Sequence, residues 1–265
     1  MTPPSAAHSG FAKVPAVTLG FWLIKILATT LGETAGDAVT MSMQLGYLAG
    51  TGIFAVLLAI AMAAQLRATR FHPALFWTVI VATTTVGTTL ADLCDRSLGI
   101  GYPGGSALLF TLLMLTLFAW HRSLGSVSIQ QLTSRKAELY YWLTILFSQT
   151  LGTALGDWVA DPHTGWGFGY RGGALLFAVG LAAVVGLYLW TRVSRTALFW
   201  AAFILTRPLG ATVGDFLDKP VASGGLALSR YSASAALVVC MLILVCTLPQ
   251  RAERLAPAAR ANEHG

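Results

Sequence analysis

Eight long apolar runs, separated by short polar segments, dominate the chain. At about 20 residues, each is long enough to cross roughly 30 Å of hydrocarbon as a helix. A bilayer offers no partner for free backbone N–H and C=O groups, so such runs predict helices. We therefore predict an all-α integral membrane protein with eight transmembrane helices, near residues 16–37, 45–66, 73–92, 104–121, 140–157, 172–191, 197–215 and 231–249.

Composition and charge support a membrane protein and indicate its orientation. The 265 residues are 55% hydrophobic and 11% charged, with a mean hydropathy of +0.68, whereas soluble domains are about 25% charged. The net charge of +6 does not indicate a nucleic-acid partner, because the basic residues lie in short loops. Of 17 Lys and Arg residues, 11 lie on the side of the two termini, which the positive-inside rule places in the cytoplasm.

One motif, Trp-x9-Gly-x4-Asp, occurs four times and divides the chain into helical hairpins. The four copies begin at Trp22, Trp77, Trp142 and Trp200. We predict one transmembrane domain over residues 15–250, built from repeats 15–70, 71–125, 135–195 and 196–250. Each hairpin returns the chain to its starting side, so the copies are parallel repeats about a pseudo-fourfold axis, or a pseudo-twofold axis relating two pairs, along the membrane normal. The terminal segments 1–14 and 251–265 are predicted to be flexible cytoplasmic tails.

Two features of the motif are interpreted as structural. An aromatic residue precedes each Trp, and we expect these pairs at the cytoplasmic membrane interface, where aromatic rings favour the headgroup level. Each repeat Gly is followed four residues later by Gly or Ala, a small-xxx-small pattern that lets helix backbones approach closely. We expect the odd-numbered spans to pack through these small residues.

A polar stripe runs along the first helix of each repeat, at steps of four that keep side chains on one face. Counted from each Trp, the seventh, eleventh and fifteenth positions carry the candidate ion-binding residues. These are Thr29, Thr84, Gln149, Glu33, Asp37, Asp92, Asp157 and Asp215. The five acids among them are also the candidate metal ligands. Lys25 and Arg207 lie within spans and are candidate counter-ions or gates.

Each carboxylate also has a purely structural interpretation. A repeat aspartate can close a helix by accepting bonds from the amides of the next segment. Glu33, which occurs in one repeat only, can form a structural ion pair with Lys25 or Arg207. Three further acids, Asp95, Asp161 and Asp218, follow the repeat aspartates and predict either an acidic outer mouth that concentrates cations or a solvated loop.

Hairpins that each end in Gly/Ala-Asp resemble a family of bacterial multi-pass membrane-anchored proteins of unassigned function, over about residues 16–249. The resemblance implies the bacterial inner membrane. More distantly, the segment Glu33-Thr34-Ala35-Gly36-Asp37 is similar to the Glu-x-Gly-Asp motifs of divalent-cation/proton exchangers. It has one extra residue, and only the first repeat keeps the Glu, so the similarity implies a cation ligand role without a specific ion.

Three functions remain open from the sequence. Oxygen ligands suit hard ions such as manganese, so the first is a transporter or exporter of a small divalent cation, coupled to protons if a buried carboxylate carries them. The second is an ion channel along the repeat axis. The third is a scaffold or partner-binding protein whose aspartates only close helices. We expect no enzyme, because no nucleophile triad, phosphate loop or zinc motif is found. Beyond lipid and the cation, no partner or cofactor is indicated.

Overall fold

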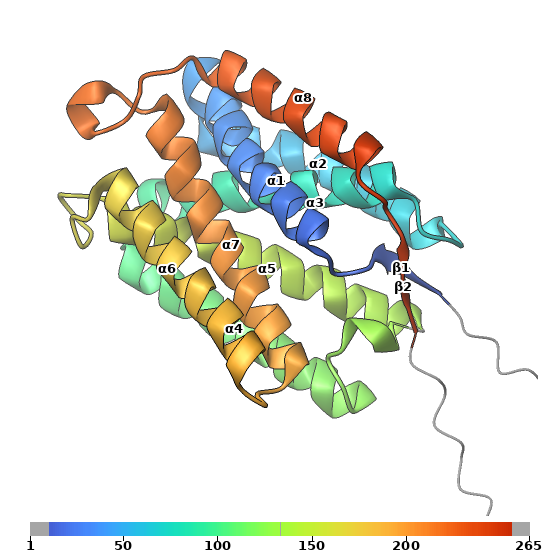
Figure 1. Ribbon diagram of the computed structural model, residues 1–265. Helices are drawn as coiled ribbons and strands as arrows, with labels where there is room; N and C mark the ends of the chain where they lie inside the picture. Colours follow the sequence, from blue (N-terminus) through green and yellow to red (C-terminus); the bar gives the residue numbers. More distant parts are fainter. Residues whose placement is uncertain (1–10, 133, 256–265) are drawn as a thin grey trace, which may run out of the picture.

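The computed structural model describes residues 11–132 and 134–255, which form eight α-helices and one two-stranded sheet (Figure 1). The helices are α1 (Leu19–Asp37), α2 (Gly46–Arg67), α3 (Pro73–Asp92), α4 (Gly101–Leu124), α5 (Arg135–Ala160), α6 (Gly169–Trp190), α7 (Arg195–Asp218) and α8 (Arg230–Thr247). The shorter elements are β1 (Phe11–Pro15), η1 (Ala38–Ser42), η2 (Leu93–Ser97), η3 (Ile129–Gln131), η4 (Val221–Ser223) and β2 (Ala252–Arg254).

The four odd-numbered helices form an inner ring in sequence order. Helix α1 packs on α3, α3 on α5, α5 on α7, and α7 closes the ring on α1. Each even-numbered helix covers the outside of the next odd one, so that α2 lies on α3, α4 on α5, α6 on α7, and α8 returns to α1. The same packing step is therefore repeated at all four junctions of the ring.

The repeat glycines explain why the inner helices pack so closely. Each lies against the next repeat's residue at the seventh position after Trp, and an added Cβ would overlap that neighbour. The four contacts are Gly32 with Thr84, Gly87 with Gln149, Gly152 with Arg207, and Gly210 with Thr29. Close approach through small residues is the main route to helix association in lipid, where no hydrophobic force drives helices together.

The aromatic pairs pack against one another around the ring, and most of their side chains are buried there. Trp77, Trp142 and Trp200 are buried. Each pair packs against the pair of the next repeat, and these contacts form a belt around the ring. The ring centroids are 5.6 Å apart for Phe21 and Trp77, 5.7 Å for Phe76 and Trp142, 6.1 Å for Tyr141 and Trp200, and 5.9 Å for Phe199 and Trp22. The position of these pairs at the cytoplasmic interface stays a prediction, and their enclosure within the bundle was not predicted from the sequence.

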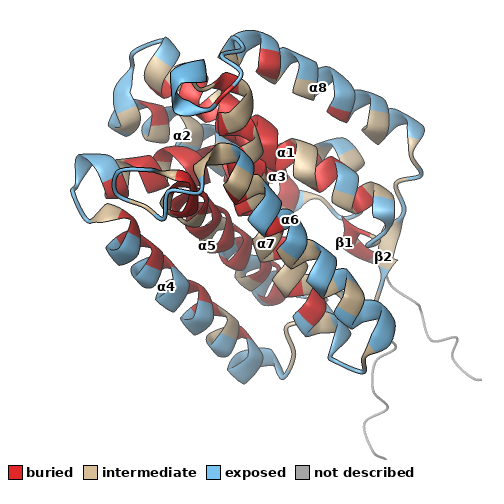
Figure 2. Ribbon diagram, turned by 60° about the vertical axis from the view of Figure 1, so that its left-hand side comes forward, coloured by how far each residue is buried: buried red, intermediate tan, exposed pale blue. Residues whose placement is uncertain are grey.

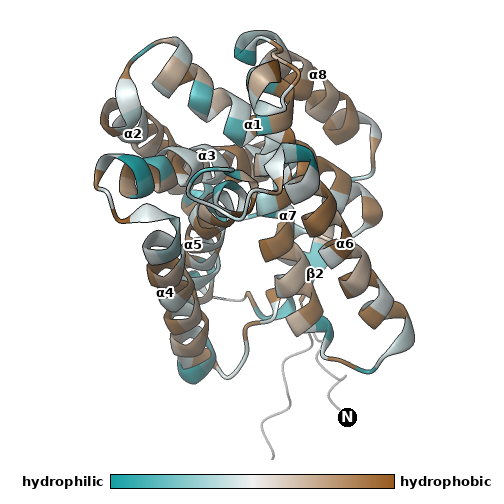
Figure 3. Cartoon of the chain, turned by 90° about the vertical axis from the view of Figure 1, so that its left-hand side faces the viewer, coloured by the Kyte–Doolittle hydropathy of each residue, from teal (hydrophilic) through white to brown (hydrophobic). Residues whose placement is uncertain are grey.

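The outer surface is apolar, as a lipid-facing surface requires. Large hydrophobic side chains such as Leu48, Phe118, Leu175 and Leu242 are exposed on the outer helices, whereas buried residues gather on the inner ring (Figures 2 and 3). By length and composition, six helices in residues 11–132 and 134–255 could cross a membrane: α2, α3, α4, α6, α7 and α8. Helices α1 and α5 are not among the six, because the polar stripe lowers their hydropathy.

The tails are more ordered than the sequence predicts. Within the segments predicted to be flexible, β1 pairs antiparallel with β2. This pairing brings the segment before α1 and the segment after α8 together beside the aromatic belt. Lys13 anchors this sheet through an ion pair with Glu138 at 2.6 Å. The rest of the predicted tails, residues 1–10 and 256–265, lies outside the described residues.

Candidate functional site

A single guanidinium group joins all four inner helices near the middle of the ring. The side chain of Arg207 on α7 is fully buried, and its Nη2 lies 2.9 Å from Glu33 Oε2 of α1 and 2.5 Å from Thr88 Oγ1 of α3. It also donates to Thr153 Oγ1 of α5. Glu33, Thr88 and Thr153 are the eleventh-position residues of the first three repeats. Of the two predicted counter-ions for Glu33, the structure therefore gives it Arg207.

The other predicted counter-ion has different contacts. Lys25 is fully buried nearer the aromatic belt, where its Nζ lies 3.4 Å from Gln149 Oε1 and 4.1 Å from the centre of the Phe203 ring. The predicted site residues Thr29 and Thr84 donate hydrogen bonds to carbonyl groups of the adjacent helix. The seventh-position side chains are thus used for packing and for joining the helices.

The four repeat aspartates are held in two pairs, each by one basic side chain. All four are buried, at most 6% exposed. Arg96 binds Asp92 of its own repeat at 2.8 Å and Asp157 of the next at 3.1 Å. Lys219 binds Asp215 of its own repeat at 3.1 Å and also Asp37 of the first repeat. The repeat aspartates are therefore paired with the cationic side chains of Arg96 and Lys219. The helix-closing interpretation instead gave them the backbone amides of the following segment as partners.

Sequence reasoning missed Arg96 and Lys219 as site residues. Both lie four residues after a repeat aspartate, in the second and fourth repeats only. This spacing places a base beside its own aspartate on a helix. The spacing could therefore have predicted the contact of each base with its own aspartate. The contact with the aspartate of the neighbouring repeat could not be predicted, because it depends on the order of helices in the ring.

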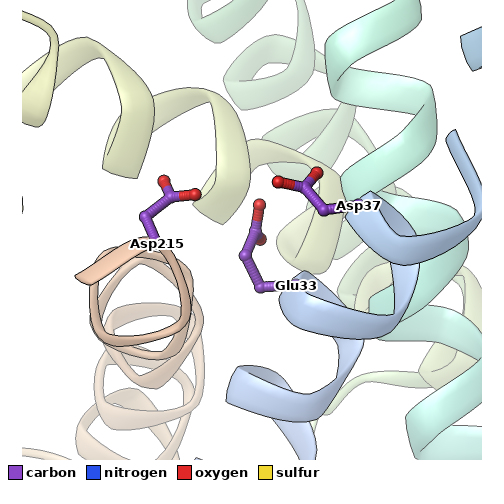
Figure 4. Close-up of side chains that lie close together, drawn as sticks. All are labelled: Glu33, Asp37 and Asp215. Atoms are coloured by element: carbon purple, nitrogen blue, oxygen red, sulfur yellow. The ribbon is translucent and has the colours of Figure 1, made fainter. Parts of the chain in front are cut away.

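Three of the predicted ligands come together at one point. Glu33, Asp37 and Asp215 each offer a carboxylate oxygen, and these oxygens lie within 4.8 Å of one another. Figure 4 shows the three side chains converging, two from α1 and one from α7. Asp37 Oδ1 is buried and has no hydrogen-bond partner within the described part of the chain. The structure thus joins these three acids in one cluster, while Asp92 and Asp157 form the other pair.

The charges at this level do not cancel. The five carboxylates of Glu33 and the repeat aspartates face three bases, Arg207, Arg96 and Lys219. A fourth base, Arg230, lies 3.7 Å from Asp37, but its charge is matched by its own ion pair with Asp218. Lys219 follows the last residue of α7, and its neighbours keep it charged. Burial lowers the pKa of Lys219, but Asp215, Asp37 and Asp218 outweigh burial and raise this pKa well above its ordinary value. With all eight groups ionised, two negative charges remain.

The three acids that follow the repeat aspartates, Asp95, Asp161 and Asp218, are more buried than residues of a solvated loop. Asp95 is buried in the middle of η2 and Asp218 at the end of α7, while Asp161 is half-buried after α5. Asp218 is paired with Arg230 at 3.0 Å. The backbone N–H groups of His163 and Thr164 donate to Asp161 Oδ1 at 2.7 and 3.0 Å. The solvated-loop interpretation is therefore wrong for Asp95 and Asp218.

Comparison with known proteins identifies the repeat. A family model described as "Repeat of Unknown Function (DUF347)" matches the chain four times, at residues 20–71, 75–126, 140–194 and 198–250. The four-repeat resemblance to a family without assigned function is confirmed. No curated protein and no solved structure matches the chain, and nothing found supports the more distant similarity to cation exchangers.

Proposed function

From the premise that this chain belongs to the DUF347 repeat family, for which no function is described, we propose that it is a membrane carrier that exchanges one small divalent cation for protons. The observation that carries this proposal is the cluster of Glu33, Asp37 and Asp215. Carboxylate oxygens suit hard cations such as Mn²⁺, Mg²⁺ or Ca²⁺.

The stoichiometry of the proposal follows from charge. Two uncompensated negative charges within an apolar bundle are costly, and a group that cannot find a partner takes up a proton instead. One divalent cation or two protons would neutralise the site equally well. Competition between the two for the same carboxylates would couple their transport.

The bound bases would act as internal substitutes for the cation. Lys219 holds Asp37 and Asp215 together, and Arg207 holds Glu33. An arriving cation would move the ammonium group of Lys219 away from Asp37 and toward Asp218, whose carboxylate also acts on it, so that the Lys219 charge stays in the charge balance of the site. Arg207, fully buried among four helices, would stay in place.

A closed axis favours a carrier over the alternative of an ion channel. At the level of Glu33, the guanidinium of Arg207 lies between α1, α3 and α5. The aromatic belt closes the same axis further along. A cation passing between the two sides would therefore need the bundle to change conformation.

The same proposal includes the topology. All eight helices would span the bacterial inner membrane, with the pseudosymmetry axis along its normal and both termini in the cytoplasm. Helices α1 and α5 would be shielded from lipid by the ring and by the outer helices, which allows them to carry more polar residues. The aspartates would then lie toward the periplasmic side.

Reconstituted protein tests the proposal. Proteoliposomes with an imposed pH gradient should take up Mn²⁺, with counterflow of protons, and Asp37→Asn should lower the initial rate at least tenfold. Glu138→Gln is the matched control, because Glu138 is also a buried, ion-paired carboxylate but lies beside Lys13 at the other end. Flux that is equal in wild type and Asp37→Asn would overturn the proposal, and the remaining alternative of a scaffold would predict no flux from any variant.

A further inference from the structure

The acidic end of the bundle is built twice, and its two halves correspond residue by residue. The second and fourth repeats each carry an acid three residues after the repeat aspartate and a base four residues after it. Asp95 and Arg96 thus correspond to Asp218 and Lys219. Both bases make the same bridge, to their own aspartate and to that of the following repeat.

In one half, a second base completes the arrangement. Arg230, the first residue of α8, places its Nε 3.0 Å from Asp218 Oδ2 and 3.7 Å from Asp37 Oδ2. Its Nη1 lies 3.2 Å from Ser42 Oγ. The guanidinium therefore fills the space between the start of α8, the end of α7 and the segment after α1.

In the other half, this base is missing and a pocket takes its place. The first residue of the corresponding helix α4 is Gly101, which has no side chain to fill the space. A pocket of about 400 Å³ lies there, lined by residues that include Asp95, Arg96, Gly101, Tyr102 and Asp161. The equivalent of Arg230 is thus replaced by a space open to an external ligand.

The carboxylate of Asp95 lacks the partner that its counterpart Asp218 has. Asp95 is 8% exposed, and neither of its oxygens has a hydrogen-bond partner among the residues that the structure describes. It lies against Gly105, the fifth residue of α4, near the helix start, where the helix dipole offers only a partial positive charge. A buried carboxylate without a bonded cation or donor is costly.

We propose that this pocket binds a cation from solution, which occupies the position that the Arg230 guanidinium occupies in the other half. Asp95 would be the main ligand. Asp161 adds a second acid where the corresponding residue of the first repeat is Met41. Asp161 also accepts a bond from the Tyr102 hydroxyl at 3.3 Å, which fixes its position at the rim of the pocket.

The ligand is a small cation, either a guanidinium-type organic ion or a divalent metal with its water shell. The correspondence with Arg230 favours the guanidinium type, and the oxygen ligands also suit a hydrated metal. The site stands apart from the Glu33, Asp37 and Asp215 cluster. Binding here is independent of the proposed transport activity, so failure of the one leaves the other intact.

Binding to purified, detergent-solubilised protein tests the inference. Isothermal titration calorimetry with methylguanidinium chloride and, separately, with MnCl₂, at constant ionic strength in KCl, identifies the class of cation. Wild type should bind either methylguanidinium or one Mn²⁺ ion in addition to any held by the Glu33, Asp37 and Asp215 cluster, and Asp95→Asn should weaken that binding at least tenfold. Asp218→Asn is the matched control, since the corresponding position already has its own base.

Two further variants keep the outcome decisive if Asp95→Asn fails to fold. Pro103→Lys, at a residue lining the pocket, should place a tethered ammonium in the site and abolish binding at the pocket. Arg230→Ala should open the corresponding space in the other half and raise the stoichiometry by one ligand. Absence of binding by both probes, or equal binding by wild type and Pro103→Lys, would overturn the inference.

Discussion

Arg207 Nη2 lies 2.9 Å from Glu33 Oε2, and this ion pair joins the fourth repeat to the first. Both residues depart from the repeat pattern, because the seventh position otherwise carries Thr or Gln and the eleventh carries Thr or Ala. Neither departure would be tolerable alone, since an unpaired buried charge is expensive. We interpret the pair as one feature that breaks the fourfold symmetry of the ring.

The first prediction concerns this pair. Glu33→Thr and Arg207→Gln each restore a residue found in other repeats, and each should lower the free energy of unfolding by about 3–5 kcal/mol because the remaining partner stays buried and charged. The double variant should lose less than the sum of the singles, with a coupling energy of about 0.5–3 kcal/mol. Unfolding in detergent measures all four proteins, and strictly additive losses would show that the two charges do not interact.

The second prediction concerns the repeat glycines. Gly210→Ala should lower the free energy of unfolding by about 1–3 kcal/mol, because the new methyl group overlaps the side chain and backbone of Thr29 on the neighbouring helix. Gly52→Ala is the control, because an added Cβ meets no atom within 4 Å there. Thermal unfolding of both variants measures the difference. Equal stability would contradict the close packing of α7 on α1.

The third prediction concerns Lys219. Removing its ammonium in Lys219→Gln leaves Asp37 and Asp215 without their shared cation. This variant should melt at a lower temperature than wild type without metal, and Mn²⁺ should raise its melting temperature by more than it raises that of wild type. Arg192→Gln, in an exposed loop, is the control for loss of a positive charge. An identical response to Mn²⁺ in all three proteins would argue against displacement of Lys219.

The fourth prediction concerns pH. Burial raises the pKa of Asp161, but hydrogen bonds from Thr164, His163 and Tyr102 outweigh it and hold this pKa below its ordinary value. Stabilisation by this carboxylate is therefore present above its unfolded-state pKa of about 3.9 and is lost as pH falls through the folded-state value. The melting-temperature difference between wild type and Asp161→Asn should thus be constant above about pH 5 and shrink toward pH 3. A melting-temperature difference that grows as the pH falls would show that the pKa of Asp161 is raised in the folded protein, which contradicts the prediction.

Periodicity in the sequence predicted the repeat, the helices and the small-residue packing. A strict spacing of Trp, Gly and Asp leaves few ways to arrange four hairpins. The close contact of Gly210 with Thr29 is accordingly the same as the contact of Gly32 with Thr84. The convergence of Glu33 and Asp37 with Asp215 was predicted only as one outcome among several, because α1 and α7 are far apart in the chain and meet only when the ring closes.

Other parts of the structure could not be predicted because they depend on contacts between distant segments. Arg96 reaches Asp157 across a junction of the ring, and β1 pairs with β2 from the opposite end of the chain. The burial of the aromatic pairs was not predicted, since Trp at a helix end suits either the headgroup level or an enclosed belt. Local spacing does not distinguish these two environments.

Locating bound manganese tests the central claim most directly. Crystals grown with MnCl₂ and measured at the manganese absorption edge should show an anomalous peak within coordinating distance of Glu33, Asp37 and Asp215, with Lys219 moved away from Asp37. The same peak should be missing in Asp37→Asn. A wild-type crystal at saturating manganese that has no peak there, and that keeps Lys219 between Asp37 and Asp215, would contradict the claim.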